Sequence, residues 1–286
     1  KFSPQDQKRD MEWESPWGKG FPGWHLECSV MARELLGDTI DIHTGGIDHI
    51  PVHHTNEIAQ TESLTGKPFS QFWVHANHLK VDGRKMSKSL GNIVTLDDIT
   101  AHGFDLDAFK LLVLSKHYRT EGNFTWEILQ THQNRLDNWR DVAALRHQTH
   151  DTLQSDDEKD TDEHTISLLA TSHAIQEALQ NDLDTPAALA IIDEAFSRLV
   201  GRTLTDIHQY GLQQLLETID ESLGLHLIES TPDISDDQKR LLLERQQARE
   251  AKDWVKSDKL RDTLAAQGIS VRDTSSGPIW GYQQHN

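Results

Sequence analysis

The chain has a single cysteine, Cys28, among its 286 residues. An internal disulfide is therefore excluded, and a reducing cytoplasm is the simplest compartment for the protein. The sequence also lacks any apolar run near the roughly 18 residues that a membrane-spanning helix needs, and it lacks the basic-then-apolar start of a signal peptide. These absences predict a cytoplasmic protein without a membrane partner.

Basic residues are scarce. The chain has 28 Lys and Arg and 46 Asp and Glu, which gives a formal net charge of −18 at pH 7. That total disfavours a nucleic-acid partner. The acidic excess is concentrated in residues 151–238, however, whereas residues 239–286 carry more basic than acidic side chains. Attraction to a polyanion depends on the local potential, so the basic tail keeps RNA as a candidate partner.

The pattern of apolar residues changes near residue 95. Before it, strand-like stretches at 39–43, 72–75 and 79–81 alternate with helical stretches at 24–36 and 51–64. This alternation is typical of a parallel α/β sheet. After it the periodicity is almost entirely helical, so the predicted fold class is α/β followed by all-α.

The helical part contains five expected helices before a more basic tail. They cover residues 104–118, 125–146, 165–180, 186–200 and 205–224. Thr185 followed by Pro186 fits an N-cap with proline at the first helical position. We expect connections at 155–163 and 231–237, then one long basic helix from about Asp236 to Gln267 and a short strand at 269–272.

The clearest chemical motif is the segment 85–89, which reads Lys-Met-Ser-Lys-Ser and is followed by Leu-Gly-Asn. Two ammonium groups neutralise charge that develops on a leaving pyrophosphate, and hydroxyl and backbone N–H groups bind its oxygens. Most clusters of lysine and serine are ordinary surface loops. This particular five-residue string favours a phosphate-binding loop instead.

A second constellation combines Cys28 on one helix with His53 and Glu57 on the next. Residues four apart lie on the same helix face, so the imidazole and the carboxylate are spaced to hold one metal ion. The mixed sulfur, nitrogen and oxygen set favours zinc over hard cations. On spacing alone, an inert core cysteine and a surface His–Glu contact remain the commoner explanations.

The segment 85–89 resembles the KMSKS loop of class I aminoacyl-tRNA synthetases. This resemblance implies a Rossmann-type catalytic domain that activates an amino acid with ATP, in which Lys88 contacts ATP and Lys85 supports it. The other motif of those enzymes, His-x-Gly-His, occurs nowhere in the chain, and the His-Ala-Asn-His string at 75–78 has the wrong third residue. The chain also begins at Lys1 within a motif-rich region. We therefore expect it to be the C-terminal portion of a longer protein.

Four further strings resemble one member of that class, the cysteinyl-tRNA synthetases. The similarity is dense to residue 100 and thinner afterwards. The strings are Trp-Glu-Ser-Pro-Trp-Gly at 13–18, Pro-Gly-Trp-His-Leu-Glu-Cys-Ser at 22–29, Asp-Ile-His-Thr-Gly-Gly-Ile-Asp at 41–48 and His-His-Thr-Asn-Glu-Ile-Ala-Gln at 53–60.

The resemblance implies one Zn²⁺ per subunit, which grips the substrate thiolate. Cys28, His53 and Glu57 match three of its four ligands, and the remaining ligand, a second cysteine, belongs to the part that this chain lacks. It further implies a cysteine pocket and an adenosine site, with ATP as substrate and Mg²⁺ alongside it. Trp24 and His43 line the cysteine pocket, and Gly45, Gly46 and Asp48 lie at the adenosine.

Thr44 and Thr55 depart from the family, where Gly and Glu are commoner. The intervals between Asp48, His53 and Glu57 are kept, so the ligand spacing is unaffected. The departures bear on the fine shape of the nucleotide pocket.

The resemblance also divides the chain. Residues 1–95 are the second half of the catalytic domain with its KMSKS-like loop, 96–150 a connecting helical region, 151–230 a helical bundle on the anticodon side and 231–286 a small basic anticodon-binding unit. Trp254 in the last unit is suited to stack on an unpaired base. The basic side chains of this last unit are explained equally well by RNA contact and by a solvated helix with internal ion pairs. They are Lys239, Arg240, Arg245, Arg249, Lys252, Lys256, Lys259 and Arg261.

The sequence thus predicts a monomeric cysteine–tRNA ligase that uses cysteine, ATP and tRNA(Cys). One alternative is the related ligase that joins cysteine to a glucosaminyl-inositol in mycothiol synthesis, which should lack the terminal anticodon-reading unit. The other is a fragment or paralogue that binds tRNA without catalysis.

Overall fold

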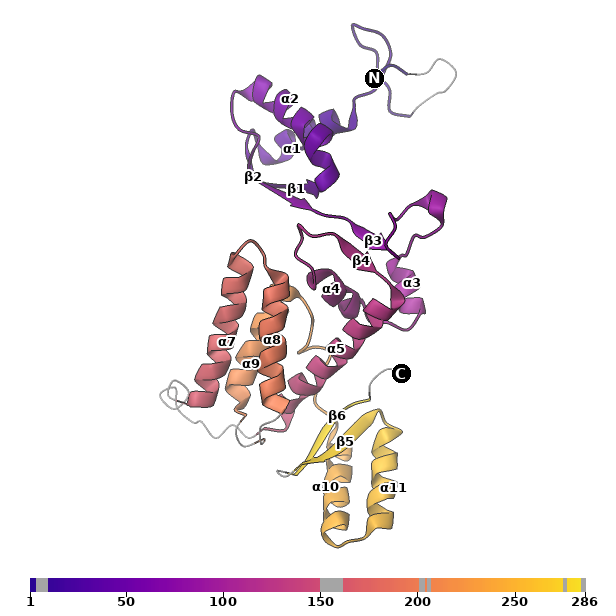
Figure 1. Cartoon of the computed structure of the whole chain (residues 1–286), viewed down its shortest axis with the longest axis vertical. Helices are drawn as coiled ribbons and strands as arrows, with labels where there is room; N and C mark the ends of the chain where they lie inside the picture. Colours follow the sequence, from indigo (N-terminus) through magenta and orange to yellow (C-terminus); the bar gives the residue numbers. More distant parts are fainter. Residues whose placement is uncertain (4–9, 150–161, 201–203, 205–206, 275–276, 284–286) are drawn as a thin grey trace. The chain divides into compact units, whose positions relative to one another are not determined.

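The computed structural model describes residues 1–3, 10–149, 162–200, 204, 207–274 and 277–283. The chain forms two compact units (Figure 1). The first consists of Lys1–Leu79 and Tyr118–Gly122, and the second of Lys80–His117 and Asn123–Asn286. Among the helices of the described residues, none has both the length and the apolar character required to cross a membrane.

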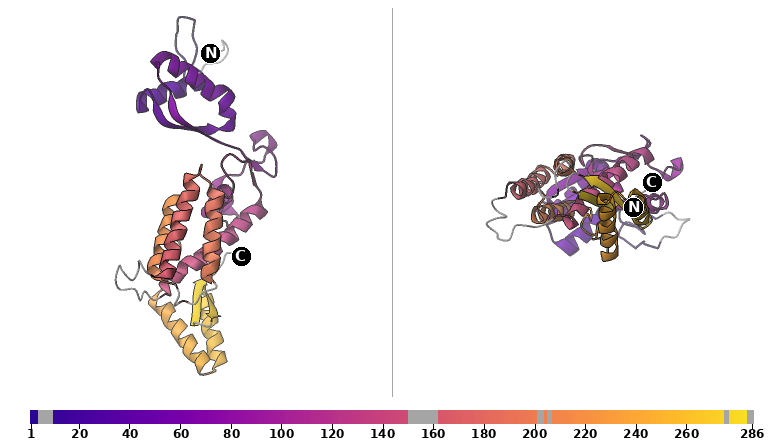
Figure 2. Two further views of the ribbon diagram at one scale, coloured as in Figure 1. Left: turned by 60° about the vertical axis from the view of Figure 1, so that its left-hand side comes forward. Right: turned by 90° about the horizontal axis from the view of Figure 1, so that it is seen from below.

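The first unit is built on two parallel strands, β1 (Ile40–Gly46) and β2 (Ser70–Ala76), as the alternation of strands and helices predicts. Their register runs from Ile40 opposite Ser70 to Gly46 opposite Ala76. Helices α1 (Trp24–Leu36) and α2 (Thr55–Thr65) lie together on one side of the pair (Figures 1 and 2). Gly66 ends α2 in the left-handed conformation at φ 68°, where a glycine carries no steric penalty.

The segment between β1 and α2 is wound irregularly. A 3₁₀ turn, η1 (Ile47–His49), leads into a π-helical turn, η2 (Ile50–His54), which continues directly as α2. Pro51 sits in the first turn, where its missing N–H leaves no helical hydrogen bond unmade. The wider π turn buries His53 and His54 one after the other. Sequence periodicity predicted a plain helix here and missed the turn.

The middle of the chain contains short strands and helices, most of which belong to the second unit. Strands β3 (Leu79–Val81) and β4 (Gly122–Phe124) form a two-stranded sheet, of which β4 was not predicted. Helices α3 (Leu96–Ala101) and α4 (Leu106–Leu114) lie between the two strands in the sequence. The long α5 (Trp126–Ala144) follows β4 and ends in a 3₁₀ turn, η4 (Leu145–His147). Thr95 and Asp98 form a capping box at the start of α3. The predicted class, α/β followed by all-α, is confirmed.

Three helices pack side by side as a bundle: α7 (Glu163–Gln180), α8 (Thr185–Val200) and α9 (Gln209–Leu223) (Figure 2). Their fully buried side chains, including Ile175, Ile192 and Leu212, form its core. The predicted N-cap at Thr185 is wrong by one residue. Asp184 accepts a hydrogen bond from the Ala187 N–H at 3.1 Å, because its short carboxylate reaches the unpaired donors of the first turn.

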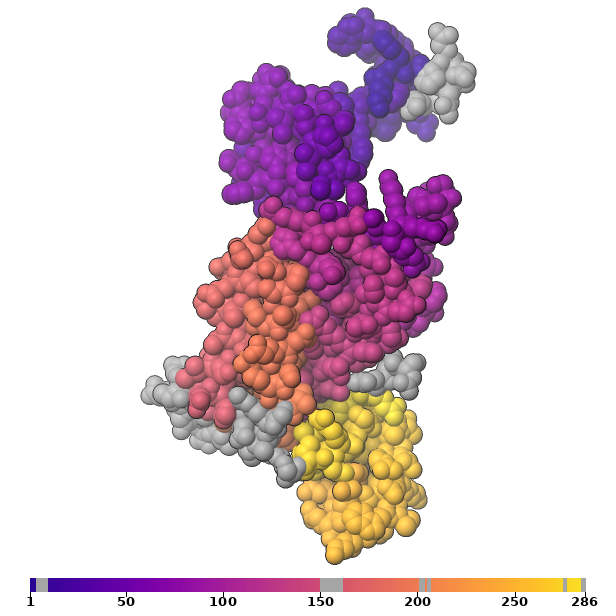
Figure 3. All heavy atoms as spheres, viewed as in Figure 1, coloured from indigo at the N-terminus to yellow at the C-terminus, as the bar shows by residue number. Residues whose placement is uncertain are grey.

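The prediction of one long basic helix near the C-terminus is wrong. The chain instead forms α10 (Asp236–Glu250) and α11 (Trp254–Ala265), separated by a turn in which Lys252 has φ 59° and the Asp253 side chain caps α11. A straight helix would carry the apolar side chains of its two halves apart. The turn lets both halves cover the antiparallel strands β5 (Ile269–Thr274) and β6 (Gly277–Tyr282), and together they form one block (Figure 3).

The end of α5 and the 3₁₀ turn after it anchor this block. Gln148 makes two hydrogen bonds to the Trp280 backbone, donating to its oxygen at 2.9 Å and accepting from its N–H at 2.8 Å. Arg146 is 5% exposed and donates to the Ile228 and Thr231 carbonyl oxygens at 2.8 and 2.7 Å. The buried guanidinium thereby satisfies the backbone of the loop that leads into α10.

Replacing Arg146 by alanine leaves these buried carbonyl oxygens without donors. We expect the Arg146→Ala variant to lose about 2–3 kcal/mol of unfolding free energy, measured by urea denaturation followed by circular dichroism. Arg198→Ala is the control, because Arg198 and Glu194 form an exposed ion pair at 3.4 Å, 51% and 73% exposed. It should change stability by less than about 0.5 kcal/mol. Equal effects of the two substitutions would contradict a structural role for the buried arginine.

Candidate metal centre and active site

Cys28, His53 and Glu57 come together in the first unit. Their ligand atoms, one sulfur, one imidazole nitrogen and one carboxylate oxygen, all lie within 4.8 Å of one another. Cys28 projects from the second turn of α1, His53 from η2 and Glu57 from the first turn of α2. The packing of α1 against η2 and α2 therefore brings the three predicted ligands to one point.

The surroundings of Glu57 fit a cation. Its carboxylate is fully buried, and Oε1 accepts no hydrogen bond within the described part of the chain although His53 Nε2 lies 3.3 Å away. A buried carboxylate oxygen without a partner is costly. A divalent ion held between Cys28, His53 and Glu57 would satisfy that oxygen, and the sulfur, nitrogen and oxygen donors match the preference of zinc.

The Cys28 thiol is protonated more readily than an ordinary thiol. Burial raises its pKa, and the negative charges of Glu57 and Glu27 raise it further, while a hydrogen bond from Trp24 opposes them. The protein residues alone thus do not favour a thiolate at this position. A cation at the cluster would reverse the local electrostatics, because it stabilises the deprotonated sulfur that ligates it.

The second oxygen of Glu57 is held by histidine. His43 Nε2 lies 2.8 Å from Oε2, and the same oxygen is 4.0 Å from His54 Nε2. His54 in turn pairs through Nδ1 with His75 Nε2 at 2.8 Å. Burial, followed by repulsion from His43 and neighbouring imidazoles, lowers the pKa of His54 to about 4, so this ring is neutral at pH 7.

A second group of possible metal ligands consists of His43, His54 and Glu57, whose ligand atoms also lie within 4.8 Å of one another. It shares the Glu57 carboxylate with the group of Cys28 and His53. Oε2 is already engaged by His43, whereas Oε1 is not hydrogen-bonded. The geometry therefore favours His43 as the residue that orients the carboxylate from behind the cluster. Sequence reasoning missed His54 and His75, because they come from η2 and β2 and only the folded chain brings their rings together.

Trp24 covers the cluster from the side of α1. Its ring contacts His53 with centroids 4.4 Å apart and His49 with centroids 5.2 Å apart, both at steep angles. It remains 59% exposed, so part of the indole faces outward beside the candidate metal position. This location is compatible with the predicted cysteine pocket.

Gly45, Gly46 and Asp48 lie at the carboxyl end of β1 and in the turn after it. A Cβ on Gly45 would stand 2.6 Å from the His54 ring, and one on Gly46 would stand 2.4 Å from an Asp48 carboxylate oxygen. Close approach of the buried His54 ring therefore requires glycine at position 45, whereas the Asp48 side chain next to Gly46 is exposed and can move. Asp48 is largely exposed, with its carboxylate 3.9 Å from His78.

The KMSKS-like loop belongs to the second unit. Lys88 lies in a 3₁₀ turn, η3 (Lys88–Leu90), which Ser87 caps by accepting from the Leu90 N–H. Asn92 accepts from the Ser87 N–H at 2.9 Å and donates to the Lys85 oxygen at 3.1 Å, so it ties both ends of the loop together. Lys85 and Lys88 are exposed, and neither forms an ion pair with a residue that the structure describes. The role of Asn92 was not predicted.

Arg245 and Arg249 of the C-terminal block both pair with Asp273, and they differ in exposure. Arg245 is 3% exposed and forms a two-pronged pair with Asp273 at 2.8 and 2.9 Å, so it is structural. Trp254 is 54% exposed, and the Arg249 guanidinium lies 5.6 Å from its ring centroid. This arginine and indole form an exposed platform of the kind that stacks on unpaired bases.

Comparison with known proteins identifies both ends of the chain. A family of tRNA synthetases class I (C) catalytic domains matches residues 4–134, and a cysteinyl-tRNA ligase anticodon binding domain matches residues 231–280. A cysteine–tRNA ligase of Chlamydia felis is 42% identical over 280 residues, covering 96% of this chain and 58% of that protein. The one of Protochlamydia amoebophila is 42% identical over 283 residues, covering 95% and 57%.

The chain thus spans rather more than half the length of the curated relatives it matches. A solved LeuRS–tRNA–LeuAMS complex from Agrobacterium radiobacter K84 shares the fold at a TM-score of 0.56 and 17% identity, over 77% of this chain and 33% of that one.

The single cysteine makes the candidate metal centre directly testable. We expect Co²⁺ to give the chain a sulfur-to-cobalt charge-transfer band, which must come from Cys28, and Zn²⁺ to slow the reaction of the same thiol with a disulfide reagent. In Glu57→Gln, the metal concentration needed for either effect should rise about 10- to 100-fold. Glu34→Gln, on the exposed face of α1, should change neither. Full thiol reactivity at saturating Zn²⁺ would rule out Cys28 as a ligand.

Proposed function

Since this chain belongs to the cysteinyl-tRNA synthetase family of class I, we propose that the whole protein joins cysteine to tRNA(Cys). In this proposal cysteine and ATP form cysteinyl-adenylate, and the cysteinyl group then passes to the terminal ribose of the tRNA. The observation that carries the proposal is the convergence of Cys28, His53 and Glu57 around an unsatisfied buried carboxylate oxygen. We also propose that the protein is a monomer and that it acts in the cytoplasm.

Selection of cysteine over serine is the hardest demand on this site. The two amino acids differ by one atom, and an apolar pocket separates such near-isosteres poorly. A bound zinc ion supplies a Lewis-acid centre that prefers a thiolate to a neutral hydroxyl. Cys28, His53 and Glu57 would hold this ion, and His43 fixes the Glu57 carboxylate through its other oxygen. Trp24, whose ring contacts His53, would form one wall of the cysteine pocket.

Adenylate formation needs positive charge at the phosphates of ATP and a grip on its adenosine. Lys88 and Lys85 are exposed side chains on a loop whose ends Asn92 ties together, so they are available to a pyrophosphate leaving group. Gly45, Gly46 and Asp48 would accommodate the adenosine, with the Asp48 carboxylate accepting from ribose hydroxyls. Mg²⁺ would accompany ATP as part of the substrate.

The proposed division of labour along the chain follows the family. Residues 1–95 contribute to catalysis, 96–150 connect, 151–230 form the bundle on the anticodon side, and 231–286 read the anticodon. The exposed pair of Arg249 and Trp254 supports the last assignment, because its indole offers a stacking surface backed by a cation. Buried Arg245 contributes by holding β5 against α10.

The selectivity account predicts the behaviour of a Cys28→Ser variant. In the complete protein, the rate of charging tRNA with cysteine should fall by about 100-fold or more. Replacing a residue that only supports a metal ligand already costs about 10- to 100-fold in activity, and Cys28 would be a ligand itself. The wild type should charge cysteine and not serine. Val30→Ser is the matched control, because Val30 lies on the same helix with 58% of its surface exposed.

The alternatives give different outcomes in that experiment. Cysteine-dependent ATP–pyrophosphate exchange without any charging of tRNA would favour a ligase acting on another cysteine acceptor, such as the glucosaminyl-inositol of mycothiol synthesis. Binding of tRNA with neither activity would favour a non-catalytic RNA-binding protein. Undiminished cysteine charging by Cys28→Ser would refute the zinc-thiolate account while leaving the reaction intact.

The account of the loop predicts a different kinetic effect for Lys88→Ala. Cysteine-dependent ATP–pyrophosphate exchange should lose about 10²- to 10³-fold in kcat, because the lysine acts on charge that develops during the reaction. Lys67→Ala serves as control, since Lys67 pairs with Asp38 on the surface of the first unit at 2.9 Å. A rise in KM for ATP with unchanged kcat would show instead that Lys88 only binds the nucleotide.

A further inference from the structure

Helix α1 turns a polar face toward α2. His25, Cys28 and Ser29 lie on this face, because residues three and four apart share one side of a helix. Ser29 is 4% exposed, and the Glu57 side chain on α2 is fully buried. The two helices that carry Cys28 and Glu57 therefore meet through polar side chains, whose contacts depend on direction as well as on distance.

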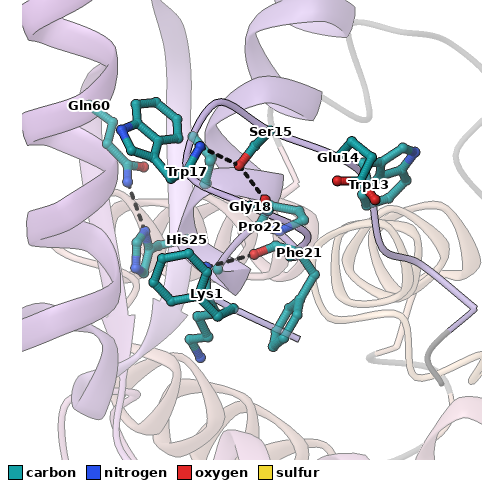
Figure 4. A pocket seen from close by; sticks show the side chains of 14 residues that line it. Lys1, Trp13, Glu14, Ser15, Trp17, Gly18, Phe21, Pro22, His25 and Gln60 are labelled. Atoms are coloured by element: carbon teal, nitrogen blue, oxygen red, sulfur yellow. Dashed lines mark hydrogen bonds between the residues drawn. The ribbon is translucent and has the colours of Figure 1, made fainter. Parts of the chain in front are cut away.

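Gln60 joins the two helices through both ends of its amide. Its Nε2 donates to His25 Nδ1 at 3.0 Å (Figure 4), and its Oε1 accepts from Ser29 Oγ at 3.3 Å. These are the two side-chain hydrogen bonds between Trp24–Leu36 and Thr55–Thr65, every residue of which the structure describes. We call Gln60, His25 and Ser29 the inter-helix clamp.

The inter-helix clamp brackets the candidate metal centre. Cys28 lies between His25 and Ser29 in one turn of α1. Glu57 lies three residues before Gln60, on the same side of α2. Movement of α1 along α2 would therefore change the distance between Cys28 and Glu57 and break the hydrogen bonds of the clamp at the same time.

A metal site needs a more precise placement of these helices than apolar packing supplies. One residue of a helix advances by about 1.5 Å along the axis, whereas the distances between a metal and its ligands are fixed to about 0.2 Å. Apolar contacts are non-directional, so they permit small displacements of one helix along another. Hydrogen bonds weaken as their length and angle change. Two of them at one amide are therefore suited to fix the relative position of α1 and α2.

We infer that Gln60 is a positioning residue for the candidate metal centre and sets Cys28 at the distance from Glu57 that one ion requires. The inference rests on the proposed function, because it takes zinc as the ion held by Cys28, His53 and Glu57. Gln60 belongs to neither group of possible metal ligands among the described residues. It acts through the position of α1, so its loss lowers the affinity for the ion without removing a ligand.

The test measures the affinity of the complete protein for Zn²⁺ by competition with a chelating indicator. Gln60→Met keeps the length of the side chain and removes both hydrogen bonds of the clamp. The affinity should fall about 10-fold, the lower end of what residues that support metal ligands contribute. Gln130→Met is the matched control and should leave the affinity unchanged, because exposed Gln130 donates to Asn134 on the same helix, α5, at 2.9 Å.

A double-mutant cycle shows whether Gln60 acts through the clamp. Ser29→Ala removes one of the two partners of the Gln60 amide, so Gln60→Met should lower the Zn²⁺ affinity less in this background than in the wild type. Equal losses in both backgrounds would overturn the inference. Urea denaturation of the metal-free protein separates positioning from folding. A lower unfolding free energy of Gln60→Met with full Zn²⁺ affinity would show a structural role alone and would also overturn it.

The outcomes distinguish this inference from the proposed function. Unchanged Zn²⁺ affinity in Gln60→Met, together with a loss in Glu57→Gln, would overturn the role of Gln60 and leave the metal centre standing. Equal Zn²⁺ binding by the wild type and by Glu57→Gln would refute the metal centre and the inference with it. Charging of tRNA with cysteine, measured on the same proteins, tests the proposed reaction independently.

Discussion

The buried carboxylate of Glu57 is the group on which the arrangement of the first unit depends. An ionised group cannot be removed from water unless partners replace its hydration, and here two sets of residues face its two oxygens. His43, from β1, holds one oxygen at 2.8 Å. Cys28 and His53 converge on the other, which accepts no hydrogen bond within the described part of the chain. The proposed metal ion would supply the missing partner of this second oxygen.

Several local features follow from placing that carboxylate. The π turn η2 carries both His53, which faces Cys28, and His54, which faces His43. Gly45 has no side chain because the His54 ring occupies that space. Burial and neighbouring imidazoles keep His54 neutral, so it crowds the site without adding positive charge. Rigid packing at this point suits selection between ligands that differ by one atom.

The chain separates rigid recognition from exposed charge. His53 and Glu57 of the candidate metal centre are buried, whereas Lys85 and Lys88 stand on a surface loop in which Ser87 and Asn92 form hydrogen bonds. In the proposed function, phosphate neutralisation needs cations that can approach a bound nucleotide and withdraw from it, and exposed lysines would meet that need. The acidic total charge is likewise a poor guide to RNA binding. The exposed indole of Trp254, with Arg249 beside it, presents a local surface that the average conceals.

The sequence by itself determined the elements and the residue types of the site. Apolar periodicity and glycine placement located α1, α2 and the parallel strands, because these signals act over a few neighbouring residues. Spacing indicated His53 and Glu57 as a pair for the same reason. It left an inert cysteine and a surface contact as the commoner explanations, and the family resemblance selected Cys28, His53 and Glu57 as predicted ligands. Tertiary structure alone decided that α10 and α11 form a hairpin, since each helix is satisfactory locally and only the core around Leu264 and Trp280 requires the turn. It also decided the pairing of His54 with His75, because η2 and β2 are distant in sequence and meet only in the folded chain.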